Sequence, residues 1–242
     1  MHNTVHFILQ GKGGIGKTLV STILAQWMMD KDETPLRCYD TDQENPTFSR
    51  YKAMDVKHVP VMTEARTIDP KRFDALMIDI LERDGNCVID NGANSFSPLM
   101  AYLIENDAFS LLQESGRKVY IHTIVGGGDT LHDTATGFVA TARATAVPLV
   151  LWENEHFGLL QSASGKLFTE SLTFNEHAAR VKGRIRLSQR NPDTFGADVK
   201  KMNTARLTVQ EVLQNEKFNI MEKQRIKVVY RDIFGQLDLV QW

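Results

Sequence analysis

A glycine-rich segment near the start of the chain carries the residue types that hold a phosphate group. Gly11 to Thr18 reads Gly-Lys-Gly-Gly-Ile-Gly-Lys-Thr and fits the pattern G-x-x-x-x-G-K-[ST]. Glycines let the backbone approach a phosphate, and a helix that begins here adds N–H donors and a partial positive charge. Lys17 would reach the β- and γ-phosphates, and the Thr18 hydroxyl would bind Mg²⁺. The segment predicts a nucleotide-binding loop made of Gly11, Lys12, Gly13, Gly14, Ile15, Gly16, Lys17, Thr18 and Leu19.

Acidic residues follow two apolar runs further along the chain. Asp40 and Asp42 come after Leu36–Tyr39, and Asp90 comes after Cys87–Ile89. An apolar strand that ends in Asp is the Walker B arrangement, whose carboxylate holds Mg²⁺ directly or through water. We therefore expect Asp90 to lie beside Thr18. A solvated acidic turn is the alternative for the pair Asp40 and Asp42.

The elements that must position these residues alternate between apolar strands and amphipathic helices. We expect strands at 5–9, 36–39, 87–89, 119–125 and 147–152, a helix after the glycine-rich loop, and another near 131–142. This alternation predicts an α/β fold with a mostly parallel, twisted sheet flanked by helices. Thr208 with Glu211, and Asn219 with Glu222, predict helix starts in a more helical C-terminal third. Ligands of such sheets bind at the carboxyl ends of the strands, where the motifs fall.

Composition limits the class of protein. The 242 residues are 42% hydrophobic and carry a formal net charge of −2, which suits a single domain over 1–242 and excludes a general basic bias. The two cysteines, Cys38 and Cys87, lie in apolar runs, so we expect buried reduced thiols instead of metal ligands. No leader-like segment or bilayer-length apolar run is present, and we expect a cytoplasmic protein.

Lys12 adds a feature that the general phosphate loop does not require. Lys-Gly-Gly-x-Gly-Lys-Thr resembles the deviant Walker A signature of ParA- and MinD-type P-loop ATPases, and Lys12 matches the extra lysine. In that family this lysine reaches across a sandwich dimer to the nucleotide of the other subunit. The resemblance implies an ATP-dependent homodimer, with ATP or ADP and Mg²⁺ as cofactors. A solvated loop lysine is the alternative.

The same resemblance implies roles for the acidic residues and for one asparagine. Asp42 would position the attacking water, Asp40 would lie near the Mg²⁺ shell, and Asn154 would contact the adenine. The implied metal-binding residues are thus Thr18, Asp40, Asp42 and Asp90, and the implied catalytic residues are Lys12, Lys17 and Asp42. The segment after Asp90, Asn-Gly-Ala-Asn, departs from the proline-containing continuation of partition ATPases.

Shorter stretches narrow the resemblance to the TraL and StbB-type proteins of conjugative plasmids. They include Phe7–Gln10, the segment from Asp40 to Phe48, 88–93, 111–114 and 225–227. The resemblance covers nearly the whole chain and implies a role in plasmid transfer, segregation or positioning, with a plasmid-encoded protein partner.

Two segments could name a surface on which the protein acts. A locally basic segment could bind DNA without sequence preference, or it could be an ordinary solvated surface. The side chains that would contact DNA are Arg180, Lys182, Arg184, Arg186, Arg190, Lys200 and Lys201. The apolar tail 233–242 follows basic residues and could lie on a membrane, but packing on the core of the protein is favoured. DNA or membrane binding would place the cytoplasmic protein at the nucleoid or the cell pole.

The function indicated by these residues is a slowly hydrolysing ATPase that works as a dimeric switch. A MinD-like membrane-associated positioning ATPase is one alternative. An ATP-dependent small-molecule ligase on the same fold is another, but such ligases lack the extra lysine that Lys12 represents.

Overall fold

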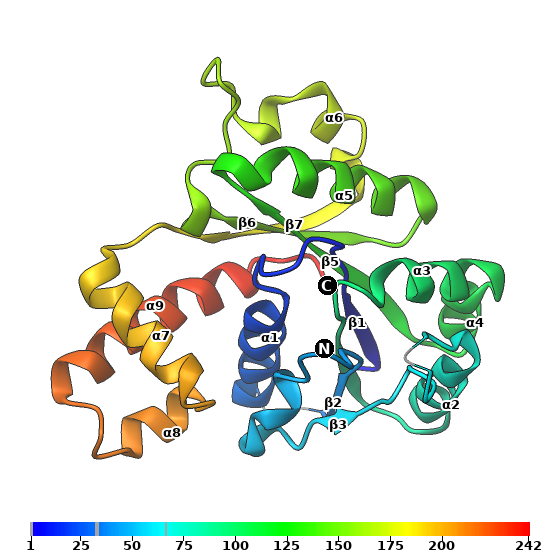
Figure 1. The fold of residues 1–242 in the computed structure, drawn as a ribbon, viewed down its shortest axis with the longest axis horizontal. Coiled ribbons are helices and arrows are strands. Elements are labelled where there is room, and N and C mark those ends of the chain that lie inside the picture. Colours follow the sequence, from blue (N-terminus) through cyan, green and yellow to red (C-terminus); the bar gives the residue numbers. More distant parts are fainter. Residues whose placement is uncertain (1, 32–33, 66) are drawn as a thin grey trace.

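Seven parallel strands form one sheet in the computed structural model, which describes residues 2–31, 34–65 and 67–242 (Figure 1). The strand order is β3-β2-β4-β1-β5-β6-β7, and every neighbouring pair is parallel. The expected mostly parallel sheet is confirmed. The strands are β1 Thr4–Ile8, β2 Leu36–Asp40, β3 Lys57–His58, β4 Asn86–Asp90, β5 Lys118–Gly126, β6 Leu149–Asn154 and β7 Val181–Leu187.

The central strands are buried on both faces, which explains their nearly continuous apolar sequences. In β1, Val5 and Phe7 belong to one hydrophobic core, and Ile8 belongs to the core on the opposite face. Each core needs its own layer of helices, because an apolar sheet face must be covered. A strand that is apolar on both faces therefore indicates three layers, with the sheet between two layers of helices.

Helices cover the two faces of the sheet as separate layers (Figure 1). One layer consists of α2 Phe73–Glu82, α3 Phe96–Glu105, α4 Ala108–Glu114 and α5 Leu131–Ala144, with the short α6 Leu172–Asn175 beyond α5. The other consists of α1 Lys17–Lys31, α7 Ala197–Thr204, α8 Val209–Gln214 and α9 Ile220–Leu237. The predicted starts of α8 and α9 are confirmed, because Thr208 and Asn219 form capping boxes with Glu211 and Glu222.

The carboxyl ends of the central strands bring the predicted motifs to one edge of the sheet. Asp40 of β2 pairs in register with Asp90 of β4, and Asp90 pairs with Ile8 of β1. The glycine-rich loop then leads from β1 into α1. In the sheet, β2 and β4 lie on one side of β1, and β5 to β7 lie on the other side. The strand order therefore reverses direction at β1, and ligands of such sheets bind at this point.

Element boundaries differ from the sequence-based expectations by one or two residues. Asp40, Asp90 and Asn154 are the last residues of their strands, instead of following them. The sequence analysis did not predict β3, β7, α2, α3 or α4, although the buried residues of α2 and α3 recur at helical spacing.

The C-terminal tail packs on the protein's own core. Ile233, Leu237 and Val240 are buried, and the Trp242 ring lies 5.2 Å from the rings of both His6 and Tyr120. This is the arrangement that the sequence favoured over a membrane-bound tail. Across the described residues, no helix combines the length and apolarity that crossing a bilayer requires.

Both cysteines are buried free thiols, as expected. Burial raises the pKa of Cys87 to about 11, so this thiol stays protonated and is a poor metal ligand.

Candidate nucleotide-binding site

The glycine-rich loop has the backbone geometry of a phosphate-binding loop. Gly14 and Gly16 have φ of 71° and 103°, a region that side chains other than glycine rarely adopt. The α1 helix begins at Lys17, so the first backbone N–H groups of that helix face the loop. Lys17 Nζ donates a hydrogen bond to the Lys12 carbonyl oxygen at 2.9 Å. The loop thus places an ammonium group and several amides around one small volume.

Burial changes the electrostatics of Lys17. Desolvation lowers the pKa of its ammonium group, while the carboxylates of Asp90 and Asp42 act in the opposite direction. The Lys17 side chain is 8% exposed, so a phosphate would meet a largely dehydrated cation. Phosphate oxygens would be strong acceptors for this group.

Hydroxyl groups from α1 hold the carboxylate of Asp90. Thr18 Oγ1 donates to Asp90 Oδ2 at 2.7 Å, and Ser21 Oγ donates to Asp90 Oδ1 at 2.8 Å. Burial, with a smaller contribution from Asp40, raises the pKa of Asp90 to about 7, against the lowering effect of the two hydroxyls. The predicted proximity of Thr18 and Asp90 is present. Ser21 was missed, although its place three residues after Thr18 puts it on the same helical face.

The oxygen groups around Asp90 fit a magnesium ion bound together with a nucleotide. Mg²⁺ takes hard oxygen ligands and is usually held by one or two protein groups, substrate phosphates and waters. Thr18 and Asp90 supply a hydroxyl and a carboxylate at one point. No group of three or more His, Cys, Asp or Glu suited to a metal is found in the described residues.

Asp40 and Asp42 have different environments in the loop after β2. Asp40 is buried, its Oδ1 accepts the N–H of Asp42 at 3.0 Å, and its Oδ2 accepts the N–H of Ser49 at 2.9 Å. Both oxygens of Asp40 thus hold the loop, and burial raises the pKa of this carboxyl. Asp42 Oδ1 accepts the N–H groups of Glu44 and Asn45, both at 3.0 Å. Within the described chain, no hydrogen bond to Asp42 Oδ2 is present, so this oxygen could accept from a water.

The segment after Asp90 packs directly against Asp42. A Cβ atom added to Gly92 would lie 2.8 Å from Asp42 Cγ, so only glycine fits there. Asn91 Oδ1 accepts hydrogen bonds from Thr41 Oγ1 at 3.0 Å and from Ser95 Oγ at 2.7 Å. The unusual Asn-Gly sequence after the Walker B aspartate therefore joins the two acidic loops.

Asn154 lies at the glycine-rich loop and contacts its backbone. Its Nδ2 donates to the Ile15 carbonyl oxygen at 3.0 Å, and its Oδ1 accepts the N–H of His156 at 3.1 Å. Both polar atoms are thus used within the protein, and Asn154 positions the loop in this structure. Contact between Asn154 and a base stays a prediction.

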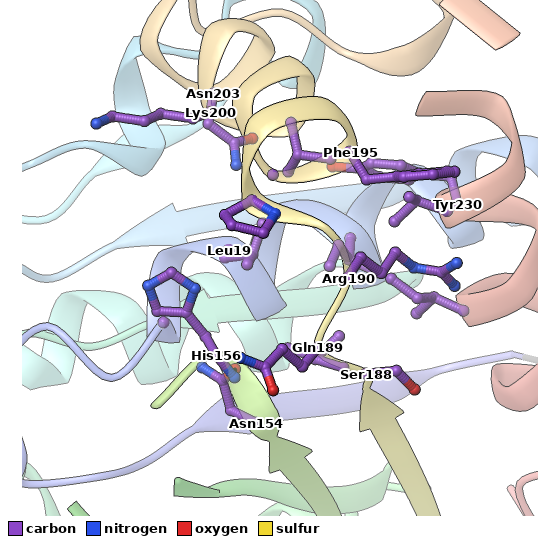
Figure 2. Close-up of a pocket in the computed structure, with 18 of the residues that line it drawn as sticks. Leu19, Asn154, His156, Ser188, Gln189, Arg190, Phe195, Lys200, Asn203 and Tyr230 are labelled. Atoms are coloured by element: carbon purple, nitrogen blue, oxygen red, sulfur yellow. The ribbon is translucent and has the colours of Figure 1, made fainter. Parts of the chain in front are cut away.

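A cleft of about 810 Å³ extends from the glycine-rich loop between β7, α7 and α9 (Figure 2). Leu19 and His156 line it near the loop, and Phe195 and Tyr230 line it from the C-terminal helical part. The Arg190 guanidinium lies 5.6 Å from the centre of the Phe195 ring and 2.5 Å from Asp232. The cleft is large enough for the base and ribose of a nucleotide whose phosphates lie on the loop.

The Lys12 side chain points away from its own loop toward α5. Lys12 Nζ lies 2.6 Å from Asp133 Oδ2, and the two side chains are 41% and 54% exposed. Of the predicted catalytic residues, Asp42 acts electrostatically on Lys17, whereas the Lys12 side chain contacts α5 instead. Asp133 was missed because nothing in the local sequence connects it with a residue so far away.

Two proteins named TraL, both from Escherichia coli, are similar to this chain over almost its full length. They are 41% and 37% identical to it over 236 residues, which is 97% of this chain and 97% of each relative. The chain belongs to the TraL family. No family model matches it.

Solved structures show the fold of this TraL-family chain. A ParA family ATPase from Chlorobium tepidum TLS has a TM-score of 0.53 and 12% identity, over 94% of this chain and 97% of that one. The septum site-determining protein MinD from Pyrococcus horikoshii OT3, complexed with Mg-ADP, has a TM-score of 0.54 and 12% identity, over 97% and 96%. The TraL-family chain thus has the ParA/MinD type of P-loop fold, as the sequence predicted.

Most of the basic side chains expected to contact DNA are paired within the TraL-family chain. Arg180 donates to the carbonyl oxygens of Ala142 and Val147, which is a structural role. Ion pairs join Arg184 and Arg186 to Glu153, Arg190 to Asp232, and Lys201 to Glu222. Within the described residues, Lys182 and Lys200 have no such partner. DNA binding by this segment stays a prediction, with fewer free charges than the sequence indicated.

Proposed function

We propose that this TraL-family chain is an ATP-binding switch ATPase that hydrolyses ATP slowly and closes as a dimer over two nucleotides. The observation that carries the proposal is the arrangement of the two loop lysines. Lys17 is buried beside Asp90, whereas the Lys12 side chain on the same loop is 41% exposed and turns toward Asp133 of α5. This difference supports the proposal that Lys17 binds a nucleotide in its own subunit and that Lys12, once released from Asp133, acts on a nucleotide in a second subunit.

Each residue of the site has a definite task in this proposal. The loop amides and Lys17 bind the phosphates, and Thr18 and Asp90 hold Mg²⁺, which neutralises charge on the phosphates. Asp42 orients a water toward the γ-phosphate through its Oδ2. Phosphoryl transfer needs mainly positioning and electrostatic stabilisation, so these groups are sufficient for slow hydrolysis.

Lys12 supplies charge stabilisation across the dimer. A cation placed on the developing phosphoryl charge from another subunit can raise the rate by several orders of magnitude. Hydrolysis would then depend on the dimer, and loss of the γ-phosphate would remove a contact that holds the dimer together. The chain would thus act as a switch, whose output is a change of partner.

The family supports a role in plasmid transfer or plasmid positioning. The TraL relatives cover the chain almost completely, and the resemblance to conjugative plasmid proteins extends over the same length. We propose that the dimer and the monomer bind a plasmid-encoded protein differently. An ATP-dependent ligase is disfavoured, since it has no use for the outward-directed Lys12.

The test replaces Lys12 and follows both dimer formation and ATP turnover. We expect Lys12→Ala to bind ATP, but to lose ATP-dependent dimers in sedimentation velocity and to lower turnover at least about tenfold. Lys182→Ala, at a lysine without a described partner, should behave like the wild type. Removing Mg²⁺ with EDTA should abolish turnover in all three proteins. If Lys12→Ala left dimer formation and turnover unchanged, the proposal would be wrong.

A further inference from the structure

The ion pair between Lys12 and Asp133 joins the glycine-rich loop to the first turn of α5. Lys12 Nζ and Asp133 Oδ2 are 2.6 Å apart, although the residues are 121 positions apart in the chain. The Lys12 ammonium lowers the pKa of the Asp133 carboxyl, so this carboxylate is ionised at neutral pH. The pair is accessible to solvent and can open without disturbing the core.

The buried side chain of Gln10 holds the two partners at a constant separation. Gln10 immediately precedes the loop, and its Nε2 donates to the carbonyl oxygens of Ile124 at 2.8 Å and Thr134 at 3.2 Å. Thr134 is the neighbour of Asp133. A Cβ atom on Gly137 would lie 2.2 Å from Gln10 Oε1, so a glycine in α5 leaves room for this contact. The start of the loop and the start of α5 are therefore locked together, and Asp133 is positioned in advance to receive Lys12.

We propose that Asp133 is a positioning residue that holds Lys12 within its own subunit and opposes ATP-dependent dimer formation. This inference rests on the proposed function, because it assumes that Lys12 acts in a second subunit. A single ammonium group paired at 2.6 Å with Asp133 cannot also reach a phosphate across a dimer interface. Each subunit must therefore break one such pair when the dimer forms.

The exposure of the pair limits how strongly it can act. Solvent-exposed ion pairs change an equilibrium by up to about fivefold. Two pairs are broken in each dimer, so their contributions multiply to at most about 25-fold. The pair can thus adjust the ATP or protein concentration at which dimers form, without preventing dimer formation.

The test replaces Asp133 and measures dimerisation directly. With Mg²⁺ and a non-hydrolysable ATP analogue, we expect Asp133→Asn to lower the dimer dissociation constant about four- to 25-fold in sedimentation equilibrium. Asp133→Glu, which keeps the charge, should stay close to the wild type. Asp129→Asn is the matched control, because Asp129 is exposed in the preceding turn and has no ion pair in the described chain.

Two further measurements separate the loss of the Lys12–Asp133 ion pair from a general effect of the substitution. Asp133→Asn added to Lys12→Ala should restore no dimers, since the ammonium group that Asp133 holds is then missing. In the protein without nucleotide, an amine-acylating reagent read by mass spectrometry should label Lys12 several-fold faster in Asp133→Asn than in the wild type, with Lys182 as the internal reference.

The outcomes distinguish this inference from the proposed function. If the wild type dimerises but Asp133→Asn dimerises equally well or more weakly, Asp133 does not oppose dimer formation, and the proposed function as a dimeric ATPase is unaffected. A weaker dimer would place Asp133 across the interface. If neither protein dimerises with the analogue, the proposed function is wrong, and the role of Asp133 in dimerisation is wrong with it. Unchanged labelling of Lys12 in Asp133→Asn would show that the two side chains do not form the ion pair.

Discussion

At the scale of single residues, the close contact between Gly92 and Asp42 leaves no room for a side chain at position 92. Asp42 is partly exposed and has one oxygen available for water, so its position must come from its neighbours. The backbone of Gly92 lies against its carboxyl carbon and limits where it can move. The tight approach explains why a glycine follows Asn91 here.

We expect Gly92→Ala to lower ATP turnover at least tenfold and to leave ATP affinity nearly unchanged. The added Cβ would displace the Asp42 carboxylate, and a misplacement of about 1 Å at a reacting centre can cost about 100-fold in rate. Turnover and fluorescent-nucleotide binding measure the two effects separately. Gly235→Ala, at a helical glycine with open space around it, is the control and should be neutral. Unchanged turnover in Gly92→Ala would show that Asp42 does not position the water.

At the scale of elements, a buried chain of hydrogen bonds links four neighbouring strands. Trp152 of β6 donates to His122 Nδ1 of β5 at 2.9 Å, and His122 Nε2 lies 2.9 Å from His6 Nδ1 of β1. His6 Nε2 then lies 2.9 Å from Thr4 Oγ1, which donates to Asn86 Oδ1 of β4 at 2.7 Å. Since each donor meets an acceptor, both histidines are neutral, with their protons on Nε2.

The two buried histidines of this hydrogen-bond network make the folding stability depend on pH. Burial lowers the pKa of His122 to about 3, and burial together with His122 lowers the pKa of His6. Below pH 6.5 the unfolded chain gains protons that the folded chain excludes, so folding stability decreases as pH falls from 6.5 toward 3. For His122 this loss amounts to about 2 kcal/mol between pH 6.5 and pH 5, and His6 adds a loss in the same direction.

We expect His6→Asn to flatten the pH dependence of unfolding between pH 7 and pH 5, because the folded protein then holds one fewer histidine that excludes protons. The asparagine Oδ1 takes the place of His6 Nδ1 and can accept from His122, but no asparagine atom takes the place of Nε2, so the contact with Thr4 is lost. The change in slope, and not the stability at one pH, is therefore the readout. Urea denaturation at both pH values gives the slope. His132→Asn, at an exposed histidine of α5, should leave the slope unchanged. An unaltered slope in His6→Asn would mean that His6 is protonated in the folded state.

At the scale of the whole molecule, the C-terminal tail closes the core that α1 and α9 share. Trp242 lies 5.5 Å from Trp27 of α1 between ring centres and donates from Nε1 to the Leu237 carbonyl oxygen at 3.1 Å. Leu239, three residues earlier, is 82% exposed. Trp242 and Val240 of the tail therefore pack on the core, whereas Leu239 does not.

We expect Trp242→Ala to lower the free energy of unfolding by about 3 kcal/mol, and Leu239→Ala to change it by less than about 0.5 kcal/mol. Neither the wild type nor Leu239→Ala should sediment with anionic liposomes, because the apolar tail is already used in the core. Denaturation and co-sedimentation measure the two properties. Liposome binding by the wild type that Leu239→Ala abolishes would favour the membrane-associated alternative.

Local pattern in the sequence determined the class of fold and the glycine-rich loop. The spacing of Gly11, Gly16, Lys17 and Thr18 requires only a strand, a turn and a helix start, which neighbouring residues specify. The alternation of buried strands with amphipathic helices likewise predicted the parallel sheet. Strand ends were displaced by one or two residues, since a strand ends where its neighbours stop pairing.

Only the tertiary structure decided which side chains meet across those elements. Ser21 beside Asp90, Gln10 beside Thr134 and Lys12 beside Asp133 bring together residues 69, 124 and 121 positions apart. The same is true of the paired arginines, which the sequence presented as free charges. Periodicity reports which face of an element is buried, but a contact between two elements depends on their packing and register. The sequence alone therefore determined the glycine-rich loop, and the packing of α5 against it decided where Lys12 points.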